Sequence, residues 1–335
     1  MALGGMAALL YIQTAVAFEL NFKAVPVNPR SRIDAIAYLG NGIIIAGTRL
    51  PAQPGYIHRS KDFGETWQAV GDITGADYIT CLRAGGNGLG YLLTGRDVHL
   101  WKTVDYGETW QDQGKICNAT NHGRANAYGL IVTRQGTVLV ADADGGGGHI
   151  HRSIDQGRTW QDIGRISPLP LYRLNEARDG WVINGWAGHI YKSTDDGLTW
   201  KDMGKLADSA LYAIEYLEDD GTLLIGTASG RVLLSKDNGA TWLDRGVVGD
   251  EADDFAWLGG TRVLYSTGTG TRSLYISENA GFTWKNIGCV PTEPGDWLDH
   301  FIYIHDRGVC MVVGGTNKGY ILHARIPDEA PAQAP

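Results

Sequence analysis

Short apolar runs alternate with glycine-containing turns along almost the whole chain. In the stretch from 35 to 70, the runs are Ala35 to Leu39, Ile43 to Gly47, Tyr56 to Arg59 and Trp67 to Val70. Apolar or alternating runs of this length between turn signals indicate β-strands. No segment sustains the spacing of apolar positions that an amphipathic helix requires. The pattern therefore predicts an all-β chain made of similar four-stranded units.

Six of these units contain the same turn, Ser/Thr-x-Asp-x-Gly-x-Thr-Trp. The first copy runs from Ser60 to Trp67, and the last, from Ser277 to Trp284, carries Asn at the third position. The third positions are Asp62, Asp105, Asp155, Asp195, Asp237 and Asn279. Their side chains can hydrogen-bond to the backbone of a tight turn, and Gly at the fifth position supplies a positive φ. We therefore expect these six residues to be structural and not catalytic.

The copies recur every 40 to 50 residues, roughly the length of one four-stranded sheet in a β-propeller. A further set of strands, Phe301 to Ile304, Val309 to Val313 and Gly319 to His323, follows the last copy and lacks a fourth strand. The extended segment Phe18 to Val25, at the other end of the chain, is left unassigned. We therefore predict a seven-bladed β-propeller with six boxes, in which the N-terminal strand closes the last blade.

The repeated turn resembles the Asp-box, or bacterial neuraminidase repeat, of Asp-box β-propellers. Proteins similar in this respect include sialidases, xyloglucan hydrolases, some polysaccharide lyases, sortilin-type receptors and photosystem assembly propellers. The units are closest in style to those of phage-tail and bacterial surface repeat proteins, which often carry a sialidase-like label. The resemblance implies the fold and leaves the chemistry open, because propellers host unrelated activities.

Charge and cysteine content narrow the classes of partner. The 335 residues carry a formal net charge of −8, so a nucleic-acid partner, which calls for a basic stripe, is not expected. The cysteines have neither CxxC spacing nor histidine companions: Cys81, Cys117, Cys289 and Cys310. We expect buried free thiols, with no zinc site, disulfide framework or cofactor.

The two ends of the chain differ from the repeats. Residues 1–17 are apolar and end in Ala15-Val16-Ala17, which resembles a signal-peptide cleavage site, although no Lys or Arg lies near Met1. This leader is too short for a confident membrane span, so we do not expect an integral membrane protein. If the leader is not a signal peptide, we expect it to form a contact in an assembly. Residues 327–335, rich in Pro and Ala, are predicted to be disordered, which leaves 18–326 for the propeller.

A binding site is expected on the face opposite the boxes, where the links between blades are long and irregular. Alignment of the units places acidic or amide residues just before the innermost strands, around the mouth of the central channel: Asp34, Asp77, Asn126, Asp253 or Asp254, and Asp299. Aromatic and histidine side chains on the same face complete the candidate ligand-binding set: Tyr128, Trp186, His189 and Trp297. An aromatic plane beside polar groups suits a sugar. The alternative is that the acidic residues only cap their strands. Asp142 and Asp144 have the spacing of the first ligands in a calcium-binding loop, but the Glu that ends such a loop is missing. We therefore predict no metal site.

Three functional classes remain to be weighed. Sialidases carry Phe/Tyr-Arg-Ile-Pro in the first blade, whereas this chain has Arg-Ile-Pro only at 325–327, so sialidase activity is not expected. A secreted glycoside hydrolase or polysaccharide lyase stays open as an alternative, because the mouth offers carboxylates, histidines and tyrosines. The units are even in length and have no large insertion to build a deep pocket. We therefore favour a non-catalytic recognition or structural propeller that binds a glycan or protein, extracellular or virion-associated.

Overall fold

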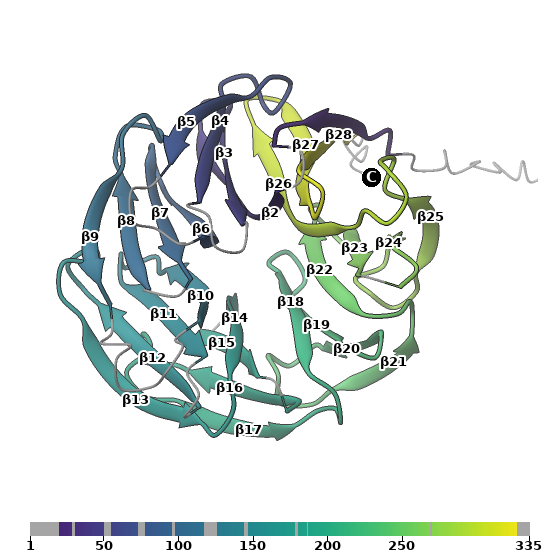
Figure 1. Ribbon diagram of the computed structural model, residues 1–335. Helices are drawn as coiled ribbons and strands as arrows, with labels where there is room; N and C mark the ends of the chain where they lie inside the picture. Colours follow the sequence, from purple (N-terminus) through teal and green to yellow (C-terminus); the bar gives the residue numbers. More distant parts are fainter. Residues whose placement is uncertain are drawn as a thin grey trace, which may run out of the picture.

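The computed structural model describes residues 20–28, 31–49, 55–72, 78–95, 98–116, 126–143, 147–177, 180–185, 187–268 and 270–326. Within these ranges every regular element is a β-strand. The strands form seven four-stranded antiparallel sheets, arranged as a ring around a central axis (Figure 1). In the same ranges, no helix is long and apolar enough to cross a membrane. The chain is thus an all-β propeller.

Six sheets are each made of four consecutive strands. The first two are β2 (Arg32–Gly40), β3 (Ile43–Arg49), β4 (Tyr56–Ser60), β5 (Gln68–Asp72), and β6 (Ile79–Gly86), β7 (Leu89–Thr94), β8 (His99–Thr103), β9 (Gln111–Lys115). The next two are β10 (Asn126–Val132), β11 (Val138–Ala143), β12 (Gly148–Ser153), β13 (Gln161–Ser167), and β14 (Leu171–Ala177), β15 (Gly180–Gly185), β16 (His189–Ser193), β17 (Lys201–Lys205). The last two are β18 (Leu211–Leu217), β19 (Thr222–Thr227), β20 (Arg231–Ser235), β21 (Leu243–Val247), and β22 (Ala252–Trp257), β23 (Val263–Thr267), β24 (Ser273–Ser277), β25 (Lys285–Cys289).

The remaining sheet is composite and joins the two ends of the chain. It has the order β1-β28-β27-β26, formed by β1 (Lys23–Pro26), β26 (Leu298–Asp306), β27 (Val309–Thr316) and β28 (Tyr320–Arg325). β1 pairs antiparallel with β28, which Figure 1 shows as a purple strand beside a yellow one. Six blades are therefore continuous in sequence and carry a box, and a composite sheet without a box completes the ring.

The prediction for the closing strand needs a correction. The sequence pattern predicts it at Phe18 to Val25, but the strand occupies Lys23–Pro26. Leu20 and Phe22 precede it and pack against the apolar cluster of the composite sheet. Burial of these two side chains therefore accounts for their alternation without strand pairing. Phe18, the leader 1–17 and the tail 327–335 lie outside the described residues.

Each box turn is held by its own side chains. In the first box, Ser60 Oγ accepts from Gly64 N at 2.8 Å and donates to Asp62 Oδ1 at 2.8 Å. The other end of the turn donates to the same carboxylate, with Thr66 N 2.9 Å from Oδ1 and Thr66 Oγ1 2.6 Å from Oδ2. The fourth position also has a positive φ, 59° at Phe63 beside 91° at Gly64, which the sequence pattern did not predict.

The same hydrogen bonds recur in the other boxes. The threonine hydroxyl and N–H lower the pKa of Asp155 and Asp237 to about 2. In the last box the amide of Asn279 takes over: its Oδ1 accepts from Thr283 N at 2.8 Å, and its Nδ2 donates to Thr283 Oγ1 at 2.9 Å. Hydrogen bonds within the turn thus explain why Asp or Asn occupies the third position of all six boxes.

Truncating a box carboxylate should destabilise the fold, and an amide should largely replace it. We expect Asp62→Ala to lower the free energy of unfolding by about 2 kcal/mol, because Ser60, Thr66 N and Thr66 Oγ1 lose their partner. Asp62→Asn should cost less than about 1 kcal/mol, since Asn279 shows that the amide fits. Denaturant unfolding measures both, and equal losses in the two variants would contradict this account.

The apolar core is divided among the interfaces between neighbouring sheets. Each box tryptophan packs against a different apolar cluster: Trp67, Trp110, Trp160, Trp200, Trp242 and Trp284. Close approach between blades also needs glycine: a Cβ on Gly47 would lie 2.5 Å from Cγ2 of Ile79 in the next blade. The first strands of neighbouring sheets contact one another around the whole ring, from β2 through β6, β10, β14, β18 and β22 to β26 and back to β2. These innermost strands therefore line the axis.

The cysteine prediction holds only in part. Cys81 is free and buried, Cys310 is free and half-buried, and Cys289 is free but exposed. Cys289 ends β25, an outermost strand whose side chains are mostly exposed, so its position in the blade explains the difference. Cys117 lies outside the described residues.

Candidate functional site

Two cavities follow the axis of the ring, one toward each face. The boxes lie on the face where the innermost strands end, since Phe63 N of the first box donates to Gly42 O, just after β2, at 2.9 Å. We call this the box face and the opposite one, where the innermost strands begin, the link face. The link-face cavity has a volume of about 300 Å³ and the box-face cavity about 550 Å³. Leu82, Arg83, Arg173 and His300 line both, so the cavities meet at these residues.

The link-face cavity is lined by arginines and carboxylates from several blades. Arg32, at the start of β2, binds Asp299 of β26 with two hydrogen bonds, Nε to Oδ2 at 3.0 Å and Nη2 to Oδ1 at 2.8 Å. Arg32 also pairs with Asp34. Arg49, at the end of β3, lies 3.2 Å from Asp34 Oδ2 and 4.8 Å from the ring centre of Tyr78. The charges at this mouth are therefore fixed in place by one another.

Burial raises the pKa of two carboxyl groups in this cavity, Asp299 and Asp253. It raises the pKa of Asp299 to about 7, with Asp34 adding to the effect and Arg32 opposing it. Trp297 Nε1 also donates to Asp299 Oδ1 at 2.8 Å. Burial, together with Asp299 and Glu251, raises the pKa of Asp253 well above its ordinary value. Strongly shifted groups in a cavity are typical of functional sites.

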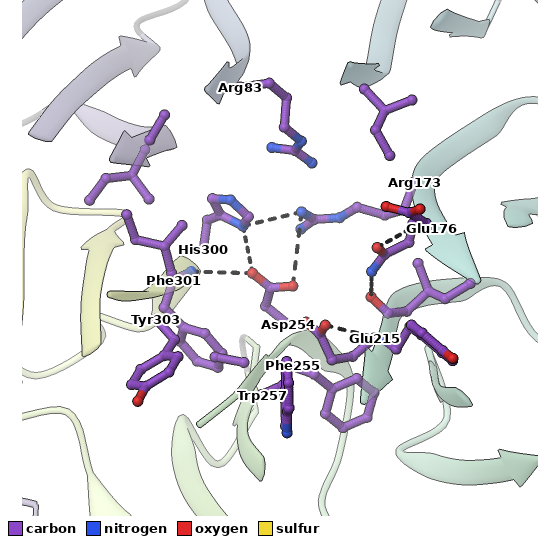
Figure 2. Close-up of a pocket in the computed structure, with 18 of the residues that line it drawn as sticks. Arg83, Arg173, Glu176, Glu215, Asp254, Phe255, Trp257, His300, Phe301 and Tyr303 are labelled. Carbon is purple, nitrogen blue, oxygen red and sulfur yellow. Dashed lines mark hydrogen bonds and ion pairs between the residues drawn. The ribbon is translucent and has the colours of Figure 1, made fainter. Parts of the chain in front are cut away.

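An ion-pair cluster of Arg173, Asp254 and His300 lies where the two cavities meet (Figure 2). His300 Nδ1 lies 2.5 Å from Asp254 Oδ2, and Phe301 N donates to the same oxygen at 3.2 Å. Arg173 Nη1 lies 3.2 Å from His300 Nδ1 and 3.9 Å from Asp254 Oδ1. Burial opposes ionisation of Asp254, but the Arg173 and His300 interactions outweigh it and lower the pKa of Asp254. Burial lowers the pKa of His300, so this imidazole is neutral near pH 7.

The box-face cavity continues from this cluster. Glu215 of β18 lines it, and Glu215 Oε1 accepts a hydrogen bond from Tyr216 N at 3.2 Å. Burial, reinforced by the charge of Asp254, raises the pKa of Glu215 to about 8, although Arg83 and Arg173 oppose the shift. Aromatic rings of Trp257 and Tyr303 line the outer part. The cavity therefore has a charged inner end and an aromatic outer end.

The structure brings together four of the residues that the sequence singled out. Asp34 and Asp299 line the link-face cavity, Trp297 binds Asp299, and Asp254 lies in the cluster behind them. His189 does not line the described part of either cavity; it starts β16, the third strand of its blade, and pairs with Asp202 at 3.0 Å.

Four predicted site residues are not tested by the structure. Asp77 and Trp186 lie outside the described residues. Asn126 and Tyr128 lie on β10, of which the structure describes the backbone at these two positions and not the side chains.

The sequence-based candidate set omitted four charged or titratable residues that line the axial cavities. Arg83, Arg173, Glu215 and His300 each lie within or near the start of an innermost strand. The sequence did contain an indication of these residues. A charged side chain inside an otherwise apolar innermost strand is expected to face the central channel, because the alternative is burial in the apolar core. In the described part of the chain, no group of three or more His, Cys, Asp or Glu could hold a metal ion.

Comparison with known proteins yields the fold. No protein-family model matches the chain, and no curated protein matches its sequence. The solved structure titled "YCF48 bound to D1 peptide" is 16% identical over 92% of this chain and 97% of that chain, with a TM-score of 0.71. Saccharomyces cerevisiae Sqt1 is 12% identical over 90% and 98%, with a TM-score of 0.63. A chain of the Mitotic Checkpoint Complex is 11% identical over 98% of both chains, with a TM-score of 0.71. At these identities the likeness extends to the β-propeller architecture alone.

Proposed function

We propose that this protein is a non-catalytic recognition propeller whose link-face mouth binds an acidic segment of a protein partner. The observation that carries the proposal is the convergence of four arginines, Arg32, Arg49, Arg83 and Arg173, on one cavity of about 300 Å³. They gather there although the chain as a whole carries a formal charge of −8. A local basic site on an acidic protein selects acidic partners.

The carboxylates beside these arginines do not fully neutralise the positive charge of the cavity. Asp34, Glu251, Asp253 and Asp299 also line the cavity, but burial raises the pKa of Asp253 well above its ordinary value and that of Asp299 to about 7, so part of Asp299 is protonated at neutral pH. The four carboxyl groups that line the cavity therefore carry less negative charge than the positive charge of the four arginines. An arginine held by a neighbouring carboxylate is also pre-oriented, so less conformational entropy is lost when it binds a ligand.

Two arguments favour a protein partner. The structural neighbours include one bound to a peptide and one from the Mitotic Checkpoint Complex, which supports a protein partner by analogy of fold. Tyr212 lines the cavity, and an aromatic ring beside arginines is typical of protein-binding hot spots. A glycan, the other ligand class that the sequence suggested, could also pack against the ring of Tyr212, so this ring alone does not distinguish the two ligand classes.

A hydrolase remains the second candidate because of one observation, the pKa of about 7 at Asp299. A general acid must reach the bond that it protonates. Both oxygens of Asp299 are already hydrogen-bonded, by Arg32 and by Trp297, which favours a structural and electrostatic role for this carboxyl group.

We also propose membership of the Asp-box propellers, on the recurring turn geometry, and an extracellular or virion-associated location. The first rests on the six turns and their shared hydrogen bonds. The second rests on the sequence alone, through the apolar leader at 1–17 and the style of the repeats.

A displayed library of random linear peptides tests the proposed function. We expect the purified protein to enrich peptides with acidic residues, and Arg49→Gln to weaken the selected peptides at least about tenfold, because a charge-assisted contact is lost. Arg325→Gln, a change at an exposed arginine at the end of β28, serves as the matched control and should leave binding unchanged. A glycan array with product analysis by mass spectrometry runs in parallel. No enrichment, or cleavage of a glycan, would overturn the proposal.

A further inference from the structure

The box-face cavity lies beyond Arg83 and Arg173 as seen from the link-face mouth, and it has the dimensions of a small-molecule site. Its volume is about 550 Å³, within the range typical of ligand pockets. It lies on the axis between the innermost strands, with the Arg173, Asp254 and His300 cluster at its inner end. Its outer end opens on the box face, which the partner proposed for the link face leaves uncovered.

The inner end presents two arginines to one ionised carboxylate. Figure 2 shows the guanidinium of Arg83 pointing toward the His300 ring and the guanidinium of Arg173. Arg83 Nη1 donates to the carbonyl oxygen of Leu82 at 2.8 Å, and among the described residues no carboxylate forms an ion pair with Arg83. Asp254 pairs with Arg173 and balances one of the two positive charges. One positive charge is therefore left for a ligand.

The other titratable groups at the inner end are neutral near pH 7. Burial lowers the pKa of His300, and burial raises the pKa of Glu215 to about 8. The protonated carboxyl group of Glu215 can donate a hydrogen bond to an anion. A single negative charge on the ligand would thus be matched, whereas a dianion would exceed the charge offered.

The acidic residues of the outer rim are paired and solvated. Arg134 lies 3.1 Å from Glu176 Oε1 and 3.4 Å from Glu218 Oε1, and the side chains of Arg134 and Glu218 are 73% and 59% exposed. Exposed charges of this kind are screened by salt and water. They therefore oppose an anion at the inner end only weakly.

Aromatic rings lie between the rim and the charged end. Trp257 is half-buried, and its Nε1 donates to Gly260 O at 2.9 Å, which fixes the ring orientation. Tyr303 is half-buried, and Phe255 is buried beneath the cavity wall. Figure 2 shows these three side chains on one side of the pocket, below Asp254 and His300. This surface suits a flat apolar body.

We propose that the box-face cavity binds a small monocarboxylic acid with an aromatic or apolar body. The carboxylate lies between Arg83 and Arg173, where Glu215 donates to it, and the body packs against Trp257 and Tyr303. Arginine and carboxylate form strong, directional pairs in a site of low dielectric constant. The site differs from the link-face mouth in its ligand, but the two share Arg83 and Arg173, so an acid bound here should weaken binding of an acidic peptide at the link face.

Calorimetric titration of the full-length protein with phenylacetate and phenylbutyrate, each beside its uncharged amide, tests the proposal. We expect at least one acid to bind about tenfold or more tightly than its amide at pH 7. Arg83→Gln should abolish the preference for the acid, and Trp257→Ala should weaken acid and amide alike. Arg325→Gln, at the exposed end of β28, should change neither the affinity for the acid nor the affinity for the amide. Thermal unfolding of each variant checks that the fold is kept.

A second measurement on the wild-type protein needs no variant. The charged and titratable groups that face the site from the surrounding strands are Arg83, Arg173, Glu176, Glu215, Glu218, Asp254 and His300. Above pH 8, ionisation of Glu215 places a negative charge beside the bound carboxylate, so affinity for the acid should fall while affinity for the amide stays constant. Equal affinities for acid and amide, binding by none of the probes, or a preference that survives Arg83→Gln would each overturn the proposal.

Discussion

Replacing Glu215 by glutamine should make the protein more stable at pH 9 by up to about 4 kcal/mol and change its stability little at pH 4. The folded-state pKa of Glu215 is raised to about 8, from an ordinary value of 4.5. Between these two values the unfolded chain is ionised at this position while the folded chain keeps the proton. Stability that is present below pH 4.5 is therefore lost as the pH rises toward 8, by about 1.4 kcal/mol for each step of one in pH. Glutamine does not titrate, so the variant escapes this loss.

Denaturant unfolding of the two proteins at pH 4 and pH 9 measures the effect. Glu218→Gln provides the matched control, because Glu218 is exposed at the rim of the same cavity and should change the free energy of unfolding little at either pH. If the free energy of unfolding of Glu215→Gln follows that of the wild type from pH 4 to pH 9, Glu215 ionises freely. The charge balance proposed for the box-face cavity would then be wrong.

Removing Arg32 should destabilise the fold by about 3 kcal/mol at pH 8.5 and by clearly less at pH 5. Arg32 supplies two of the three side-chain hydrogen bonds to Asp299, whose side chain is 3% exposed. Without Arg32, a buried carboxylate is left poorly compensated, which is costly in proteins. Because burial raises the pKa of Asp299 to about 7, this carboxyl group is protonated at pH 5 and needs the arginine less there.

Free energies of unfolding for Arg32→Ala at the two pH values test this prediction. Arg231→Ala is the control: Arg231 pairs with Asp244 at 2.5 Å on the surface, where both side chains are nearly half exposed. Such a pair contributes less than about 1 kcal/mol. A loss for Arg32→Ala no larger than that of the control, or equal at both pH values, would mean that the mouth is solvated and not the desolvated site described above.

Much of the fold could be predicted from the sequence, because each box is a local device. The side chains of Ser60, Asp62 and Thr66 hydrogen-bond to one another and to the backbone of the turn, so eight residues suffice to specify it. The spacing of the copies then sets the size of one blade. The closing strand was harder to place. The bounds of β1 depend on pairing with β28, almost 300 residues away, and the pattern of Leu20 and Phe22 reflected burial and not pairing.

The candidate site could be predicted only in part, because it forms at the axis from residues that no local pattern connects. Asp34 and Asp299 were found because they occupy similar positions in aligned units, and the structure places them within the first three residues of innermost strands. Arg83 and Arg173 occupy the interiors of β6 and β14, and only the closed ring brings them to His300 and Asp254. His189 repeats the placement of His99 and His149 on third strands, and its partner is a carboxylate on the neighbouring strand. Repetition thus explains His189 without a ligand.

Hydrogen–deuterium exchange with a peptide selected from the displayed library tests the central claim most directly. We expect the bound peptide to slow amide exchange at the starts of the innermost strands on the link face, around Arg32 of β2 and Asp299 of β26. The box turns at Ser60 to Trp67 and Ser277 to Trp284 should exchange as in the free protein. Protection confined to the box turns or to the outermost strands, with none at the link-face mouth, would contradict the account.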